Sequence, residues 1–205
     1  MRIPLLLALL LLPTTLPAQS DTAKSPKDAL LGQDAAARAG DPDADAKFYY
    51  AADDHQRDLL KLIARGDVAL AGLQSAVTNA FGKDLALQVV HAAGTVVTDD
   101  VKAATEKVDG DKATVTFKND ATPLHMVRID GDWKVSLPDM LGEATPPQLE
   151  KLAGKFTEFT AEIDKLTDLV AHKKFRSGQG VRDRVKALHD RLFKSNSDEA
   201  GANGV

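Results

Sequence analysis

Residues 106–117 read EKVDGDKATVTF, and residues 124–135 read LHMVRIDGDWKV. Both stretches contain Asp-Gly-Asp, and Asp-Gly supplies the positive φ angles that a two-residue hairpin turn requires. Around each turn, apolar and polar residues alternate with a period of two, which is typical of a half-buried strand. The sequence therefore predicts an antiparallel meander of four strands, near residues 101–108, 112–118, 123–129 and 132–137.

The second hairpin determines which side chains share the inner face of this sheet. If Asp130 and Gly131 form the turn, Arg128 lies opposite Trp133 on an otherwise apolar face. Arg128 then either binds a carboxylate or phosphate ligand, or has a structural role in which it stacks on Trp133 as a cation–π pair or reaches solvent at the rim. We favour the structural role. A change of one residue in the turn reverses the faces and places His125 inside instead.

The chain before the meander carries helix-start and helix-stop signals. Ser25 before Pro26, and Asp41 before Pro42, are pairs typical of an N-cap and a first helical residue, and glycine ends helices. These signals predict three helices: one that starts at Pro26 and stops at Gly40, one from Pro42 to about Arg65 that ends at Gly66, and one from Asp67 to about Phe81.

A helical wheel of residues 47–65 places His55 within the apolar face, and Tyr49 borders the same stripe. On the core side of a helix that closes a cavity, a neutral imidazole can act as a general base. The alternative, which we favour, is a core histidine with one satisfied hydrogen bond. His55 is therefore the candidate base, and Tyr49 is a candidate pocket residue.

The C-terminal third predicts two amphipathic helices joined by a turn at residues 177–180. The first helix has an apolar seam with alternating spacings of three and four, formed by Leu149, Leu152, Phe156, Phe159, Ile163, Leu166 and Val170. The seam favours an intramolecular helical hairpin over residues 146–194. Its alternative is a coiled coil between copies of the chain, which would give a homo-oligomer through residues 149–170.

The N-terminus has the pattern of a secretory signal peptide. Arg2 precedes an unbroken apolar run from Leu5 to Leu12 and a small-residue exit, so cleavage is expected after Ala18 or after Ser20. A membrane-spanning helix needs about 20 apolar residues, and this run is too short. We therefore expect an exported protein, periplasmic or extracellular, with no transmembrane anchor.

Composition excludes several classes of protein and site. The chain has 205 residues, 43% of them hydrophobic, and it contains no cysteine. Disulfides, thiol nucleophiles, thiolate zinc sites and iron–sulfur centres are therefore excluded. The five histidines show no metal-ligand spacing, and there is no phosphate-binding glycine loop or dinucleotide fingerprint, so neither metal nor cofactor is expected.

The net charge of −4 hides an uneven distribution. Residues 21–170 hold 17 Lys or Arg against 26 Asp or Glu, whereas residues 171–195 hold eight against two. The basic segment fits an acidic partner, or it docks on the acidic body of the same chain, which we favour. An acidic, exported protein with few aromatic residues is not expected to bind nucleic acid.

The order of the elements and the two hairpin sequences resemble the secreted NTF2-like superfamily (SnoaL-like, cystatin-like cone domains). The resemblance covers residues 27–140 and is carried by EKVDGDKATVTF and LHMVRIDGDWKV. It implies a cone of helices on a curved antiparallel sheet, with a pocket between them. It implies no reaction, because the superfamily includes isomerases, dehydratases and non-catalytic modules.

The sequence thus predicts an α+β fold: an NTF2-like cone with a C-terminal helical hairpin. Its expected division is a signal peptide (1–20), a linker (21–26), the NTF2-like domain (27–145), the hairpin (146–194) and a disordered tail (195–205). The favoured function is an exported, non-catalytic module that binds a small ligand or a protein partner. The alternative is a small lyase, isomerase or hydrolase with His55 as base and Arg128 or Tyr49 orienting the substrate.

Overall fold

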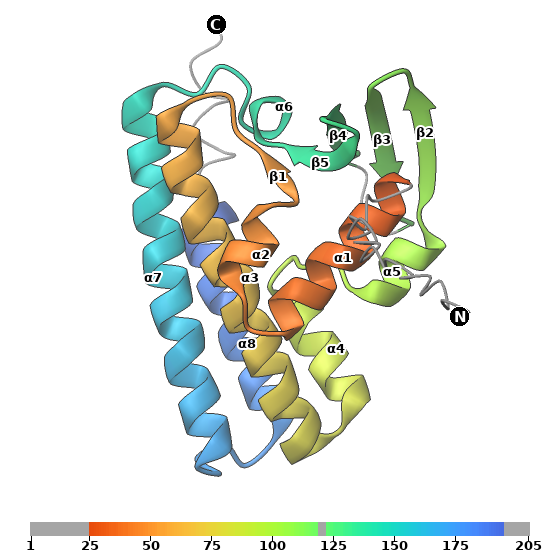
Figure 1. Ribbon diagram of the computed structural model, residues 1–205. Helices are drawn as coiled ribbons and strands as arrows, with labels where there is room; N and C mark the ends of the chain where they lie inside the picture. The colour runs from red at the N-terminus through yellow and green to blue at the C-terminus, as the bar shows by residue number, and fades with distance from the viewer. Residues whose placement is uncertain (1–24, 119–121, 195–205) are drawn as a thin grey trace, which may run out of the picture.

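A computed structural model of the protein describes residues 25–118 and 122–194. The predicted signal peptide and the predicted C-terminal tail lie outside the described residues. The fold is α+β, as the sequence predicts. A bundle of long helices stands beside a sheet that is covered by shorter helices (Figure 1).

The sheet has five strands in the order β1-β5-β4-β3-β2 within the described residues. The predicted meander is confirmed, because the four strands that follow one another in sequence pair antiparallel. β1 is a short strand that the sequence did not predict, and it pairs parallel to β5. The strands are β1 (Tyr49–Tyr50), β2 (Thr105–Asp109), β3 (Lys112–Thr116), β4 (Leu124–Ile129) and β5 (Asp132–Ser136).

The predicted second hairpin is confirmed to the residue. Asp130 and Gly131 form the turn with φ angles of 53° and 90°, and Arg128 is paired with Trp133. The first hairpin has the same local sequence but turns one residue later, at Gly110 and Asp111, because Asp109 pairs with Lys112. The two Asp-Gly-Asp sequences therefore form turns in different registers.

Two helices cover the inner face of the sheet. α1 (Pro26–Arg38) starts where predicted, with the Ser25 hydroxyl accepting a hydrogen bond from the Asp28 amide, and α5 (Thr98–Ala103) occupies the start of the first predicted strand. Their apolar residues and those of the strands form one core, which we call the sheet core: Ala29, Leu30, Val101, Ala104, Ala113, Val115, Phe117, Met126, Trp133 and Val135.

Four helices form the bundle: α3 (Asp54–Phe81), α4 (Lys83–Ala92), α7 (Pro146–Ala171) and α8 (Gly178–His189), with a last π-helical turn over Asp190–Lys194. α7 lies along α3, and α8 lies along α4 (Figure 1). They enclose a second core, the bundle core, formed by Ala69, Leu70, Leu73, Val77, Ala86, Val89, Ala93, Phe159, Ile163, Leu166, Val170, Val181, Val185, Leu188 and Leu192.

The packing of α7 within the chain bears on the two interpretations of its apolar seam. Ile163, Leu166 and Val170 are each at most 2% exposed, because α3 covers them within the same chain. These three seam residues are therefore packed within the same chain, and the alternative contact between copies through residues 149–170 stays a prediction. The two C-terminal helices also pair mainly with α3 and α4 rather than with each other.

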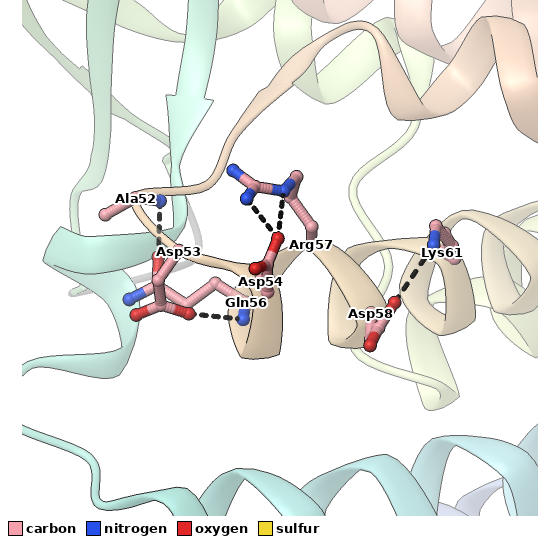
Figure 2. A network of polar contacts seen from close by, with 7 residues as sticks. All are labelled: Ala52, Asp53, Asp54, Gln56, Arg57, Asp58 and Lys61. Carbon is pink, nitrogen blue, oxygen red and sulfur yellow. Dashed lines mark hydrogen bonds and ion pairs between the residues drawn. The ribbon is translucent and has the colours of Figure 1, made fainter.

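The helix predicted from Pro42 to Arg65 is wrong. The chain instead forms a short α2 (Pro42–Ala46), then β1, and then starts α3 at Asp54. A new helix starts after Asp53, because the Asp53 side chain accepts a hydrogen bond from the backbone N–H of Gln56 (2.8 Å). The side-chain oxygen of Gln56 in turn accepts one from the backbone N–H of Ala52 (2.9 Å) (Figure 2). This reciprocal cap fixes the start of α3.

The predicted break at Gly66 is also wrong, because α3 continues through it to Phe81. Gly66 is buried where α3 meets α7. A Cβ at this position would lie 3.5 Å from Thr160 Oγ1 and 3.9 Å from Phe156 Cδ1. These are ordinary contact distances, so a Cβ would fit against α7, and the glycine does not end the helix. The remaining helix, α6 (Leu137–Leu141), follows β5 directly.

Candidate functional site

The candidate base His55 does not face the interior. It is exposed in the first turn of α3, whose buried face near this end runs through Gln56, Leu59 and Leu60. The helical wheel placed His55 inside because it was drawn for a helix continuing back to residue 47. The real helix starts one residue before His55, so no preceding turn covers the imidazole.

The Arg128 and Trp133 candidates lie together, as a stacked pair. The guanidinium carbon of Arg128 is 4.5 Å from the centre of the Trp133 ring, while Trp133 itself is only 1% exposed. His125 is exposed and points away from this face, since the hairpin register alternates the side chains. The cation–π interpretation of Arg128 is the one observed.

Tyr49 belongs to a polar cluster between the sheet core and the bundle core, which we call the junction cluster: Gln33, Asp45, Tyr49 and Asp67. Its members come from α1, α2, β1 and α3. The Tyr49 hydroxyl donates to Asp67 Oδ2 (2.7 Å), and the Gln33 amide donates to the Tyr49 oxygen (2.7 Å) and to Asp67 Oδ2 (3.2 Å). The cluster ties the sheet side of the molecule to α3.

Asp45 is the unusual member of the junction cluster. Its side chain is fully buried beside Gln33 and Asp67, and no N–H or hydroxyl group of the described residues donates to either carboxyl oxygen at normal hydrogen-bond geometry. Burial, together with the charge of Asp67, raises the pKa of Asp45 from 3.8 to about 8. Burial also raises the pKa of Asp67, to about 6, although the hydrogen bonds from Tyr49 and Gln33 lower it.

Burial and the charge of Asp67 raise the pKa of Tyr49 well above its ordinary value, so the phenol remains a hydrogen-bond donor at neutral pH. Buried carboxyls with raised pKa values are found at catalytic sites and also in structural networks. Neither of the two cavities described below is lined by Asp45, Tyr49 or Asp67. The junction cluster is therefore a structural element of the fold that is sensitive to protonation.

The predicted pocket between helices and sheet is filled by side chains. Trp133, Met126 and Leu30 occupy the inner face of the sheet, and Phe48 packs against them from the chain before β1. None of the five predicted pocket residues lines either cavity: Tyr49, His55, His125, Arg128 and Trp133.

A cleft of about 560 Å³ opens instead between α1, α3, α4 and α5, which we call the junction cleft. α1 and α5 pack on the sheet core, whereas α3 and α4 belong to the bundle core, so the cleft lies where the two cores meet. Its lining residues are Arg38, Ala71, Gln74, Ser75, Thr78, Asn79, Lys83, Leu87, Val97, Thr98, Asp99 and Lys102.

The junction cleft contains three basic side chains from three different helices. Arg38 Nε lies 2.9 Å from Asp34 Oδ2, and the Thr98 hydroxyl donates to the same carboxylate oxygen, which joins α1 to α5. Lys83 and Lys102 are exposed and make no ion pair with any described side chain. The cleft therefore has unpaired positive charge available.

Sequence reasoning did not find this cleft. Its residues come from four segments between Arg38 and Lys102 that share no spacing or motif. A second cavity of about 550 Å³ lies between α6 and the start of α7, with exposed Met140 at its edge.

The basic C-terminal segment forms ion pairs within itself and with the neighbouring helix α7. Arg191 pairs with Glu158 of α7 (2.6 Å), and Lys186 and Lys194 pair with Asp190. Within residues 25–118 and 122–194, no group of three or more His, Asp or Glu side chains is arranged to hold a metal ion. No helix in these ranges is long and apolar enough to cross a membrane.

Comparison of the chain with protein-family models, with curated proteins and with solved structures found no match.

Proposed function

We propose that the protein is an exported, non-catalytic binding protein and that its ligand site is the junction cleft. The observation that carries this proposal is the cleft itself, which combines a ligand-sized volume with polar side chains from four helices. Ligand sites occur preferentially at junctions between packed units, where concave surfaces form without loss of core. The cleft lies between the sheet core and the bundle core and so fits this pattern.

Export is supported by the N-terminal sequence, with cleavage near Ala18–Ser20. The relation to NTF2-like domains belongs to the same proposal. It is supported by the order of helices before an antiparallel meander and by the two hairpin sequences. The enzymatic alternative has no supporting observation, because His55 is exposed and lines neither cavity.

A blocking substitution tests the site. Ser75 is exposed and lines the cleft from α3, so Ser75→Trp should fill the cleft without disturbing either core. Ala80→Trp is the matched control, since Ala80 is exposed on the same helix but does not line the cleft. Both variants are compared with the unmodified protein in a thermal-shift screen against a library of neutral, cationic and anionic small metabolites.

We expect at least one compound to raise the melting temperature of the unmodified protein and of Ala80→Trp but not of Ser75→Trp. If every compound that binds also binds Ser75→Trp, the cleft is not the ligand site. If no compound binds at millimolar concentration, the proposed small-molecule function is wrong. Mass spectrometry of the protein recovered from its producing cells tests export, through the mass of the cleaved chain.

A further inference from the structure

We infer that the junction cleft binds a small organic molecule with two or more negative charges, carried by carboxylate or phosphate groups. This inference rests on the proposed function and names the ligand class for the same site. Three observations support it: the sign of the charge in the cleft, the absence of partners for that charge, and the mixture of polar and apolar lining.

The sign of the charge in the cleft is opposite to that of its surroundings. Residues 21–170 carry 17 Lys or Arg against 26 Asp or Glu. The lining of the cleft has Arg38, Lys83 and Lys102 against the carboxylate of Asp99. Because Arg38 pairs with Asp34, the unpaired positive charge of the cleft comes from Lys83 and Lys102. A concave, positively charged site on an acidic protein concentrates its field on an anion that enters it.

Lys83 and Lys102 form no ion pair with a described carboxylate, although Asp99 lies one helical turn before Lys102 and lines the same cleft. On the exposed faces of α3 and α7, Lys61 pairs with Asp58 (2.9 Å) and Lys165 pairs with Glu162 (2.6 Å). In the cleft, neither Lys83 nor Lys102 has such a partner among the described residues. An anionic ligand therefore gains two ammonium groups without having to displace an internal ion pair.

Neutral side chains of the cleft suit the same ligand class. Ser75 and Asn79 supply a hydroxyl and an amide that can donate hydrogen bonds to carboxylate or phosphate oxygens. Ala71, Leu87 and Val97 add an apolar part to the lining. An inorganic ion uses only the polar groups, whereas a small organic anion uses both, and a volume of about 560 Å³ accommodates its carbon skeleton.

The test uses isothermal titration calorimetry with three probes: citrate for carboxylates, glucose 6-phosphate for phosphates, and glucose as the neutral reference. The variant Lys83→Gln/Lys102→Gln removes both charges but keeps side chains of similar length. The control Lys47→Gln/Lys107→Gln makes the same change in net charge at two exposed lysines outside the cleft.

We expect citrate or glucose 6-phosphate to bind the unmodified protein and the control, and to bind the cleft variant with a Kd about tenfold higher. Binding should also weaken when NaCl is raised, because the lysines are exposed. The stronger of the two anions identifies carboxylate or phosphate as the preferred group.

The inference is overturned if neither anion binds, if the cleft variant and the control bind equally, or if glucose binds as tightly as its phosphate. The proposed function is tested separately by Ser75→Trp. If that substitution abolishes binding of a neutral or cationic compound from the screen, the cleft is still the ligand site and only the anionic ligand class is wrong. If Ser75→Trp weakens the binding of no compound, the junction cleft is not the ligand site.

Discussion

The carboxyl groups of Asp45 and Asp67 interact electrostatically in the interior of the protein, where α2 packs against α3. Asp67 accepts hydrogen bonds from Tyr49 and Gln33, whereas no N–H or hydroxyl group of the described residues donates to fully buried Asp45 at normal hydrogen-bond geometry. Two such carboxyls cannot both ionise without a large electrostatic cost. At neutral pH the pair therefore holds a proton.

The first prediction is that the free energy of unfolding decreases as pH rises from about 4 to about 8. The folded-state pKa of Asp45 is raised from 3.8 to about 8, so in this window the folded protein binds more protons than the unfolded chain. The stabilisation is complete below the unfolded pKa and is lost through the folded pKa, at about 1 kcal/mol per pH unit. Urea denaturation at pH 5 and pH 8 measures the difference.

Asp45→Asn should remove most of this dependence and should be more stable than the unmodified protein at pH 8, because the amide never ionises. Asp43→Asn is the matched control, since Asp43 is exposed on the same short helix. Equal pH profiles for Asp45→Asn and the unmodified protein would show that Asp45 is not the titrating group.

The second prediction concerns the stacked pair on the sheet. Arg128→Ala should lower the free energy of unfolding by about 0.5–1 kcal/mol, because an exposed cation–π contact is lost. Trp133→Ala should cost about 3–5 kcal/mol, because the ring is buried in the sheet core. Circular dichroism during urea denaturation measures both. Lys112→Ala, at an exposed position on β3, is the control and should have little effect; an equal loss there would argue against stacking.

The third prediction is that alanine has opposite effects on stability at two buried glycines, Gly66 and Gly178. Gly66→Ala should stabilise the protein by about 0.5–1 kcal/mol, because the new Cβ makes ordinary contacts with α7 and the helix interior gains a better helix former. Gly178→Ala should destabilise it by about 1–3 kcal/mol, because its Cβ would lie 2.0 Å from Leu85 Cδ2. Melting temperatures of the two variants should move in opposite directions. Two shifts of the same sign would contradict the packing seen at one of the two sites.

The fourth prediction tests the seam of α7. Ile163→Ala should reduce the free energy of unfolding by about 2–5 kcal/mol, because Ile163 is fully buried in the bundle core. Glu150→Ala, at an exposed position on the same helix, should change it little. Light scattering should give the same molar mass for both variants and the unmodified protein. A loss of mass in Ile163→Ala would instead support a contact between copies through this face.

Sequence alone predicted those parts of the fold that local chemistry determines. The turn at Asp130-Gly131 needs only two residues with positive φ, and this turn places Arg128 opposite Trp133. The start of α1 follows from the Ser25 side chain and its own first turn. In each case the residues that decide the structure are neighbours in sequence.

The predictions that were wrong concern places where contacts with residues distant in sequence determine the local structure. Tyr49 and Tyr50 form a strand because β5 supplies its partner from the other end of the domain. Gly66 remains helical because α7 packs over it. The candidate site failed for the same reason, since the junction cleft is assembled from helices whose contacts no local pattern predicts.

The order of the strands has a consequence for the behaviour of the protein at high concentration. β2 is the last strand of the sheet, and all five of its residues are exposed. Its outer main-chain groups are a template on which another β-strand can add, and exposed Val108 favours such an addition. Glu106, Lys107 and Asp109 oppose it, because charges along an open edge must be desolvated before two copies can join. These three side chains therefore protect the protein from edge-to-edge aggregation.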